Sequence, residues 1–294
     1  VRRGIHLEKP LQLVNIFSAP TPVMAPRRVL VVIERDASAK LLTCDHTQDA
    51  DNAYLSSEVV EIALEENARL DYYSIEESSA LTTRHSNLFA RMQRGSHLSG
   101  GSITLTCGTT RNDFSLDLAG EGCECLLAGM VIGSERMHTD NAVQLRHLAP
   151  RCHSNQLFKY VLDGESTGAF GGRILVTPQA DFTDAYQTNR NLLASPQARM
   201  HTKPQLEIYN DDVKCSHGAT TGQLDREALF YMRTRGIPEP EARNMLMQAY
   251  MSDVIDAVAM EELRDRLRHL VERRFAGADM TCSDCAATCR TKKA

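Results

Sequence analysis

The sequence lacks the features that nucleic-acid and membrane proteins need. Its 33 lysines and arginines are outnumbered by 38 aspartates and glutamates, which gives a net charge of -5. A protein that binds nucleic acid or an anionic membrane surface needs a basic face, so we expect neither partner. No uninterrupted apolar run approaches the ~20 residues of a membrane-spanning helix, which predicts a soluble chain.

Several catalytic signatures are also missing. The dipeptide Gly-Lys does not occur, which argues against a Walker phosphate-binding loop and an ATPase activity of the chain's own. No G-x-G-x-x-G opens a helix, and H-E-x-x-H is absent. We therefore expect a protein that is not an enzyme.

Cysteine is present at modest density, with nine residues in 294. An odd count in a chain of this length favours reduced thiols, and we expect a cytoplasmic location. Three of the cysteines crowd the C-terminus, at Cys282, Cys285 and Cys289. They leave a zinc or cluster site one ligand short, unless another chain or a distant His completes it. Free thiols on a disordered tail, residues 277–294, are the other interpretation.

Polar corners that contain a small residue recur between residues 28 and 222, at intervals of 27 to 31 residues. The aligned corner residues are Ala37, Ala68, Ser96, Cys123, Cys152, Ala180 and Asp211. Between them lie short segments with the two-residue period of strands, such as residues 103–106 (ITLT) and 114–118 (FSLDL). No helical period fills the gaps, so the repeat predicts a β-helix with up to two coils in each interval. An antiparallel sandwich of many short strands is the alternative.

Helical patterns replace the strands after residue 223. Asp225 can cap a helix that Gly236 ends, and prolines open a second helix at about residue 238. A third helix carries one apolar stripe, with arginines on its other faces. The stripe consists of Leu263, Leu267, Leu270 and Val271. These helices can cap an open end of the β-helix, dock a partner, or do both.

The stretch DVKCSHGAT, residues 212–220, places Cys215 and His217 two residues apart. In a strand both side chains point to the same face, which suits a shared metal or cluster site. A nucleophilic Cys–His pair lacks a local orienting group or oxyanion hole. A buried thiol beside a hydrogen-bonded imidazole is the structural alternative.

At this stretch the chain resembles a known family. Residues 202–237 (TKPQLEIYNDDVKCSHGATTGQLDREALFYMRTRGI) closely resemble the signature of SufD, within the SufB/SufD family of SUF iron–sulfur cluster assembly proteins. The likeness extends from about residue 7 to 275. SufB chains tend to carry Glu-His-Glu-Ala-Thr where this chain has Cys-Ser-His-Gly-Ala-Thr, and they lack the Gly-Gln-Leu-Asp that follows. Here that run is TTGQLD, which favours SufD.

The resemblance implies a right-handed parallel β-helix, residues 28–222, followed by a small C-terminal helical region, residues 223–276. It implies a non-enzymatic scaffold that pairs with a SufB-like paralogue and binds a SufC-like ABC-type ATPase through its C-terminal helices. It places His217 and Cys215 at the SufB–SufD interface. There they would share a transient iron–sulfur cluster or iron with SufB, and the isolated chain would bind none stably and could form a homodimer.

The residues expected to contact the ATPase lie on the first helix. They are Asp225, Glu227, Phe230, Tyr231, Arg233 and Arg235. Members of the family carry an N-terminal helical region before the β-helix, so residues 1–27 are expected to be a lead-in that follows a missing segment. The cysteine trio at the C-terminus is not part of the family pattern.

Two other functions remain compatible with the sequence. A SufB-like primary scaffold would hold a cluster by itself. A polysaccharide-active β-helix enzyme would carry clustered carboxylates in a groove along one face.

Overall fold

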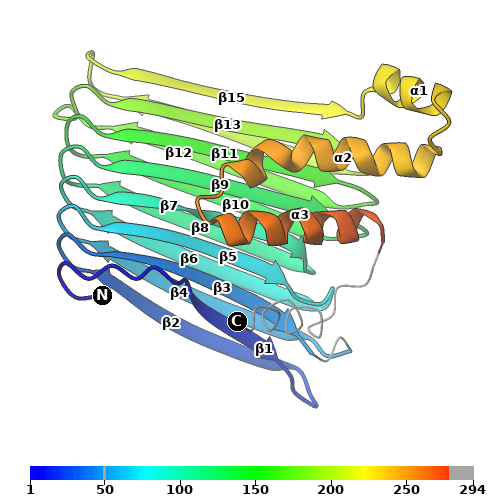
Figure 1. The fold of residues 1–294 in the computed structure, drawn as a ribbon, viewed down its shortest axis with the longest axis horizontal. Helices are drawn as coiled ribbons and strands as arrows, with labels where there is room; N and C mark the ends of the chain where they lie inside the picture. Colours follow the sequence, from blue (N-terminus) through cyan, green and yellow to red (C-terminus); the bar gives the residue numbers. More distant parts are fainter. Residues whose placement is uncertain (49–50, 278–294) are drawn as a thin grey trace.

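The chain forms a coil of parallel strands with three helices on one side (Figure 1). The computed structural model describes residues 1–48 and 51–277. The strands are β1 (Leu11–Phe17), β2 (Val23–Ile33), β3 (Ser38–Thr47), β4 (Tyr54–Leu64), β5 (Arg69–Glu77), β6 (Thr82–Met92), β7 (His97–Thr106), β8 (Thr109–Leu118), β9 (Glu124–Gly133), β10 (His138–His147), β11 (His153–Leu162), β12 (Thr167–Val176), β13 (Asp184–Leu193), β14 (Arg199–Ile208) and β15 (Lys214–Gln223). The helices are α1 (Arg226–Thr234), α2 (Glu239–Asp256) and α3 (Glu261–Phe275).

The strands alternate between two parallel sheets. The odd-numbered strands form an eight-stranded sheet in the order β1 to β15, which we call sheet A. The even-numbered strands form a seven-stranded sheet from β2 to β14, which we call sheet B. This arrangement is a β-solenoid of about seven coils. The predicted β-helix is therefore confirmed, and the antiparallel sandwich is wrong, because the strands pair in parallel.

Each interval of the sequence repeat holds one coil and not two. Ser38 pairs with Arg69, and Arg69 pairs with His97, so the next strand of the same sheet comes one full interval later. Most strands are 10 or 11 residues long, and two strands with their corners use up the whole interval. The solenoid also begins earlier than residue 28, because β1 starts at Leu11.

The small residues of the repeat stack in one corner of the solenoid. Ala37, Ala68, Ser96, Cys123 and Cys152 each precede an odd-numbered strand, and all are buried. Thr183 and Val213 hold the equivalent places in the last two coils, instead of the expected Ala180 and Asp211. The corner before β13, residues 177–183, is longer than the equivalent corners, which explains the shift from Ala180 to Thr183.

The same corner turns through a left-handed residue in six successive coils. These residues are Asp36, Asn67, Gly95, Gly122, Arg151 and Phe182, with φ between 56° and 69°. A left-handed conformation costs most side chains roughly 1–2 kcal/mol, and Gly, Asn and Asp tolerate it best. Asn67 also donates a hydrogen bond from Nδ2 to Asp36 Oδ1 at 2.9 Å, which links two neighbouring corners.

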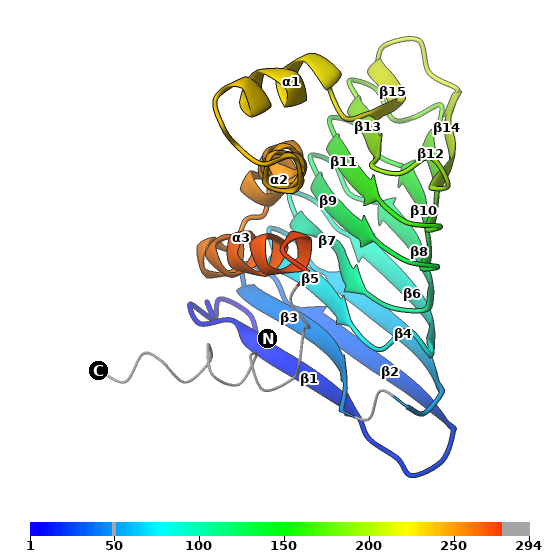
Figure 2. The same ribbon diagram turned by 90° about the vertical axis from the view of Figure 1, so that its right-hand side faces the viewer.

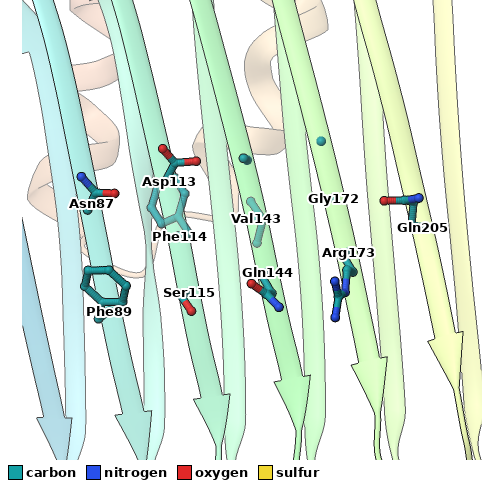
Figure 3. Close-up of a pocket in the computed structure, with 12 residues that line it drawn as sticks. Asn87, Phe89, Asp113, Phe114, Ser115, Val143, Gln144, Gly172, Arg173 and Gln205 are labelled. Carbon is teal, nitrogen blue, oxygen red and sulfur yellow. The ribbon is translucent and has the colours of Figure 1, made fainter.

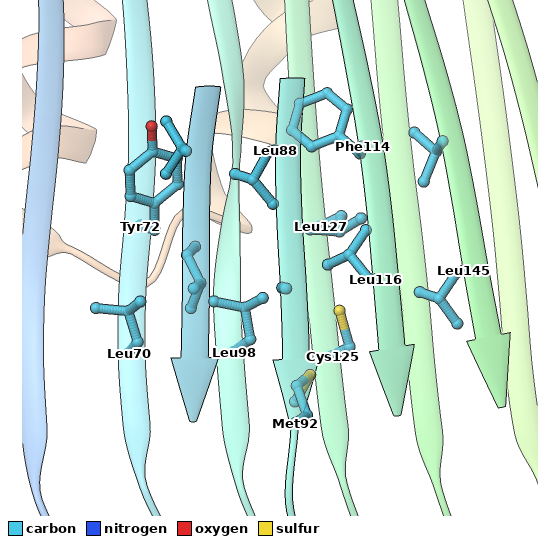
Figure 4. Close-up of a cluster of buried hydrophobic side chains, with 14 of the residues drawn as sticks. Leu70, Tyr72, Leu88, Met92, Leu98, Phe114, Leu116, Cys125, Leu127 and Leu145 are labelled. Atoms are coloured by element: carbon cyan, nitrogen blue, oxygen red, sulfur yellow. The ribbon is translucent and has the colours of Figure 1, made fainter. Parts of the chain in front are cut away.

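The interior of the solenoid is filled by alternate side chains of both sheets. In β8 and β10 every second residue is buried, as expected for a sheet with one face on the core. Leu70 and Tyr72 of sheet A meet Leu88 and Leu116 of sheet B in this core (Figure 4). The interior therefore holds successive coils together through stacked apolar columns.

Helices α2 and α3 cover the outer face of sheet A (Figure 2). They do not cap an end of the solenoid as expected, because their apolar residues pack against this face. Strand β7 is consequently buried along nearly its whole length, because the sheet packs on both faces. The expected stripe of α3 is confirmed, since Leu263, Leu267, Leu270 and Val271 are all buried. Two arginines of α3 do not point to solvent as expected: Arg274 donates to the carbonyl of Leu105, and Arg266 lies 3.7 Å from Glu77.

Helix α1 begins and ends as predicted. The Asp225 carboxylate accepts hydrogen bonds from the backbone of Glu227 and Ala228, and Gly236 follows the helix with a φ of 85°. None of the α1 residues is buried against the described part of the chain. None of the described helices has the length and apolar character to cross a bilayer.

Candidate functional site at the last coil

Strand β15 forms the outer edge of sheet A, and β14 forms the outer edge of sheet B. Each pairs on one side only, with β13 and β12 respectively. No described strand or helix covers the backbone N–H and C=O groups along these two outer edges. The last coil is therefore an open end, and α1 leaves it directly after β15 (Figure 1).

Cys215 and His217 lie on the inward face of β15, as their spacing predicts. Cys215 is in register with Ala185 of β13, which is buried in the interior cluster with Ile174 and Val176 of β12. Cys215 packs against this cluster and is half-buried. His217 follows on the same face. Because no further coil of the described residues stacks on it, its side chain is exposed at the end of the interior.

The environment of the two side chains favours the imidazole as a ligand. Burial raises the pKa of the Cys215 thiol above its ordinary value, which disfavours the thiolate that binds metals. A neutral imidazole needs no such ionisation to bind iron. Among the residues that the structure describes, no group of three or more His, Cys, Asp or Glu is placed to hold a metal ion.

The residues expected to contact an ATPase lie together on the exposed surface of α1 and its two ends. Phe230 and Tyr231 are 68% and 58% exposed, which is unusual for large aromatic side chains. The Arg235 guanidinium lies 5.0 Å from the Tyr231 ring, and Arg233 pairs with Glu239 at 3.2 Å. Asp225 is used as the helix cap, and Glu227 lies in the first turn of α1.

The cysteine trio Cys282, Cys285 and Cys289 lies outside the described residues. Two cysteines of the sequence repeat lie in the stacked corner, where packing needs small side chains. Cys123 and Cys152 occupy adjacent coils of the corner stack, and Cys125 faces the apolar interior. All three are free cysteines.

The outer face of sheet B carries a shallow groove of about 410 Å³ across β6 to β14 (Figure 3). Asp113 is the one carboxylate among the described residues that line it. Although partial burial acts to raise the pKa of Asp113, hydrogen bonds from Arg111 and His85 hold it below its ordinary value. A glycosidase needs two carboxyl groups, one of them with a raised pKa, so this groove does not fit a polysaccharide-active enzyme.

The sequence reasoning missed the side chains beneath His217. Gln187 of β13 is in register with His217, and Gln156 of β11 is in register with Gln187. Both glutamines are buried. The spacing in the sequence could have revealed this column. Gln156, Gln187 and His217 are about one repeat interval apart, and all three are at inward positions of their strands.

Comparison with known proteins identifies the family of this fold and sequence. Residues 16–250 match the family model described as SUF system FeS cluster assembly, SufBD core domain. An iron–sulfur cluster assembly SufBD family protein of Synechocystis sp. is 31% identical over 279 residues, which cover 92% of this chain and 61% of that protein. The iron–sulfur cluster assembly protein SufD of Escherichia coli is 36% identical over 182 residues, which cover 62% of this chain and 42% of that protein.

A more distant relative agrees with these two. The iron–sulfur cluster assembly protein SufD of Bacillus subtilis is 24% identical over 279 residues, which cover 93% of this chain and 63% of that protein. The chain thus spans about half the length of the curated relatives that it matches. The match to the core domain covers most of the solenoid together with α1 and part of α2. The chain therefore belongs to the SufB/SufD family of the SUF iron–sulfur cluster assembly system.

Proposed function

We propose that this chain is a SufD-like, non-enzymatic scaffold subunit. It pairs with a SufB-like paralogue and binds a SufC-like ABC-type ATPase, and it contributes to cluster assembly and iron acquisition at the seam between the two scaffolds. The observation that carries the proposal is the position of His217 and Cys215 on the inward face of an uncovered last coil.

The open edges of the last coil support pairing with another solenoid. Strands β14 and β15 are each 10 residues long. No other strand of the described residues pairs with their outer backbone groups. Exposed edges of this length are a template for strand pairing with a second chain. A SufB-like solenoid end is the proposed partner, and a second copy of this chain takes its place when the chain is isolated.

The seam would supply the ligands that this chain lacks. His217 offers one imidazole and Cys215 one thiol, and a stable iron or cluster site needs more ligands than these. The remaining ligands come from the paralogue, so the cluster is transient and shared, and the isolated chain binds none stably.

A cytoplasmic location stays a prediction, and so does any metal binding by Cys282, Cys285 and Cys289.

The exposed aromatic side chains of α1 support an ATPase docking surface there. Phe230 and Tyr231 stay uncovered, whereas the apolar stripe of α3 is used against the solenoid. Replacing Phe230 and Tyr231 together by serine should therefore abolish co-purification of the ATPase and leave the melting temperature unchanged. Arg268→Ser, at a half-exposed arginine of α3, is the matched control. If Arg268→Ser releases the ATPase and the double variant retains it, the docking surface lies on α3.

The central test is co-expression with the SufB-like and SufC-like partners. We expect His217→Ala to give an intact complex with most of its iron and sulfide lost. Ser216→Ala, on the opposite face of the same strand, should keep both. An intact His217→Ala complex with its full cluster content would remove His217 from the chemistry and leave a purely structural scaffold.

A SufB-like primary scaffold is the alternative function. It predicts that the chain alone, reconstituted with iron and sulfide, holds a stable coloured cluster. The SufD-like proposal predicts no stable absorbance beyond that of the His217→Ala variant.

A further inference from the structure

A short ladder of buried amides lies beneath His217. Gln156, Gln187 and His217 occupy the same register position in β11, β13 and β15, on the inward face of three successive coils. Gln156 and Gln187 are 0% and 2% exposed. The ladder therefore runs from the sealed interior to the open end of the solenoid.

The direction of the ladder is set by one hydrogen bond. Gln187 donates from Nε2 to Gln156 Oε1 at 3.1 Å. This bond uses the side of the Gln187 amide that faces β11. The opposite atom of the same amide, Gln187 Oε1, is buried and has no hydrogen-bond partner in the described part of the chain. An unpartnered buried amide oxygen costs about 1–3 kcal/mol, so a donor is expected beside it.

The opposite sheet holds the Gln187 amide in place. Gly172 of β12 faces it across the interior, and a Cβ atom at Gly172 would lie 2.2 Å from Gln187 Nε2. Any other residue at this position would push the amide out of the ladder. Because the amide is wedged between Gln156 and Gly172, its free oxygen has little freedom to turn towards another donor.

We propose that Gln187 is a positioning residue for His217. In the proposed arrangement the exposed His217 ring, which is next in the column, turns one N–H towards Gln187 Oε1. This oxygen then accepts the hydrogen bond that it lacks in the structure. The acceptor fixes one neutral tautomer and the direction of the ring. The other ring nitrogen then keeps its lone pair and points out of the open end, where a partner completes the ligand set. This inference rests on the proposed role of His217 at the seam.

The histidine tautomer provides a readout that a purely structural role would not move. The full chain labelled with ¹⁵N-histidine gives ring shifts that distinguish the two neutral tautomers, recorded at alkaline pH where free imidazole is neutral. The signal of His217 among the ten histidines is assigned by its loss in His217→Ala. We expect a single tautomer in the wild type and a mixture of both in Gln187→Met, which keeps the length of the side chain and removes the acceptor. Asn189→Leu, at the next inward position of β13, removes a buried amide but leaves both glutamines in place. It is the matched control and should keep the single tautomer.

Cluster content of the co-expressed complex is the second readout. Loss of an outer hydrogen-bond partner of a metal-binding His typically weakens metal binding 10- to 100-fold, so Gln187→Met complexes should lose most of their iron while complex recovery is unchanged. A tautomer mixture for His217 in the wild type, which needs no variant to fold, would overturn the inference. So would an unchanged tautomer in Gln187→Met. Either result leaves the proposed function intact if His217→Ala still loses the cluster, whereas full cluster content in His217→Ala overturns the proposed function itself.

Discussion

Arg84 donates a hydrogen bond from Nε to Asp45 Oδ2 at 2.9 Å inside the solenoid, where both side chains are buried. The same guanidinium donates to Glu58 at 2.8 Å and lies 2.9 Å from Glu76. Arg27 adds a second positive charge against Asp45 and Glu58. Three buried carboxyl groups thus face two guanidinium groups, and the electrostatic balance leaves one carboxyl in excess.

Removing Arg84 should destabilise the protein strongly. Arg84→Met keeps much of the side-chain volume but leaves the buried carboxylates with Arg27 alone. Breaking a buried ion pair by removing one partner typically costs about 3–5 kcal/mol. Chemical denaturation should report a loss of that size in the free energy of unfolding. Arg91→Met, an outward neighbour on β6 whose side chain is 62% exposed, should change it by less than about 0.5 kcal/mol. Equal effects of the two substitutions would contradict this account.

The excess carboxyl predicts a pH-dependent stability. Burial raises the pKa of Glu76 to about 7, so the folded state keeps a proton that the unfolded state releases above its ordinary value of 4.5. The stabilisation from this group is therefore fully present below pH 4.5 and is lost as the pH rises through about 7. The loss is on the order of 3 to 4 kcal/mol, because the pKa rises from 4.5 to about 7 and each pKa unit corresponds to about 1.4 kcal/mol.

The variant Glu76→Gln isolates this effect because it mimics the protonated acid. Burial lowers the pKa of His147 to about 4, which makes stability rise with pH across part of the same range. This opposing contribution is common to both proteins and cancels in the difference. We expect Glu76→Gln to gain stability relative to the wild type as the pH increases from about 5 to about 8, measured by urea denaturation at each pH. A difference that stays constant would show that Glu76 is ionised throughout.

The stacked corner should tolerate glycine better than a branched residue. Asn67 has a φ of 58°, and both Asn67→Gly and Asn67→Val remove its hydrogen bond to Asp36. Valine in addition pays the cost of the left-handed conformation, roughly 1–2 kcal/mol. Thermal melts of the two variants should therefore differ, with Asn67→Val the less stable. If the valine variant melts with the glycine variant, the corner does not require this backbone conformation.

Lys159 should anchor α2 on the solenoid. It is 4% exposed, donates from Nζ to the carbonyl of Tyr250 at 2.7 Å, and pairs with Asp253. Hydrogen bonds to charged groups contribute about 1.5–3 kcal/mol, so Lys159→Met should weaken the docking of α2 by that order. Hydrogen exchange of the α2 amides should become faster. Arg190→Met removes a half-exposed cation 3.8 Å from the same Asp253 and should leave the exchange nearly unchanged.

Much of the local structure could be predicted from the sequence. The repeat interval revealed the solenoid, the capping Asp225 and Gly236 marked the limits of α1, and the stripe from Leu263 to Val271 marked the buried face of α3. The spacing of Cys215 and His217 placed both on one face of a strand. These features depend on backbone periods of two or 3.6 residues and on capping side chains, and such signals are contained in a few neighbouring residues.

Only the tertiary structure decided which of those faces are covered and by what. Residues of one column, such as Gln156, Gln187 and His217, are about one coil apart in the sequence, and a corner of different length shifts the register between them. The pattern of β7 could not reveal that α2 and α3 bury its outer face, because that contact joins residues more than a hundred positions apart. By itself the sequence determined the repeat, the helices and the family. Stacking of the coils decided that the imidazole of His217 lies at the open end of the interior. It lies next to the buried amide of Gln187, whose Oε1 has no hydrogen-bond partner in the described part of the chain.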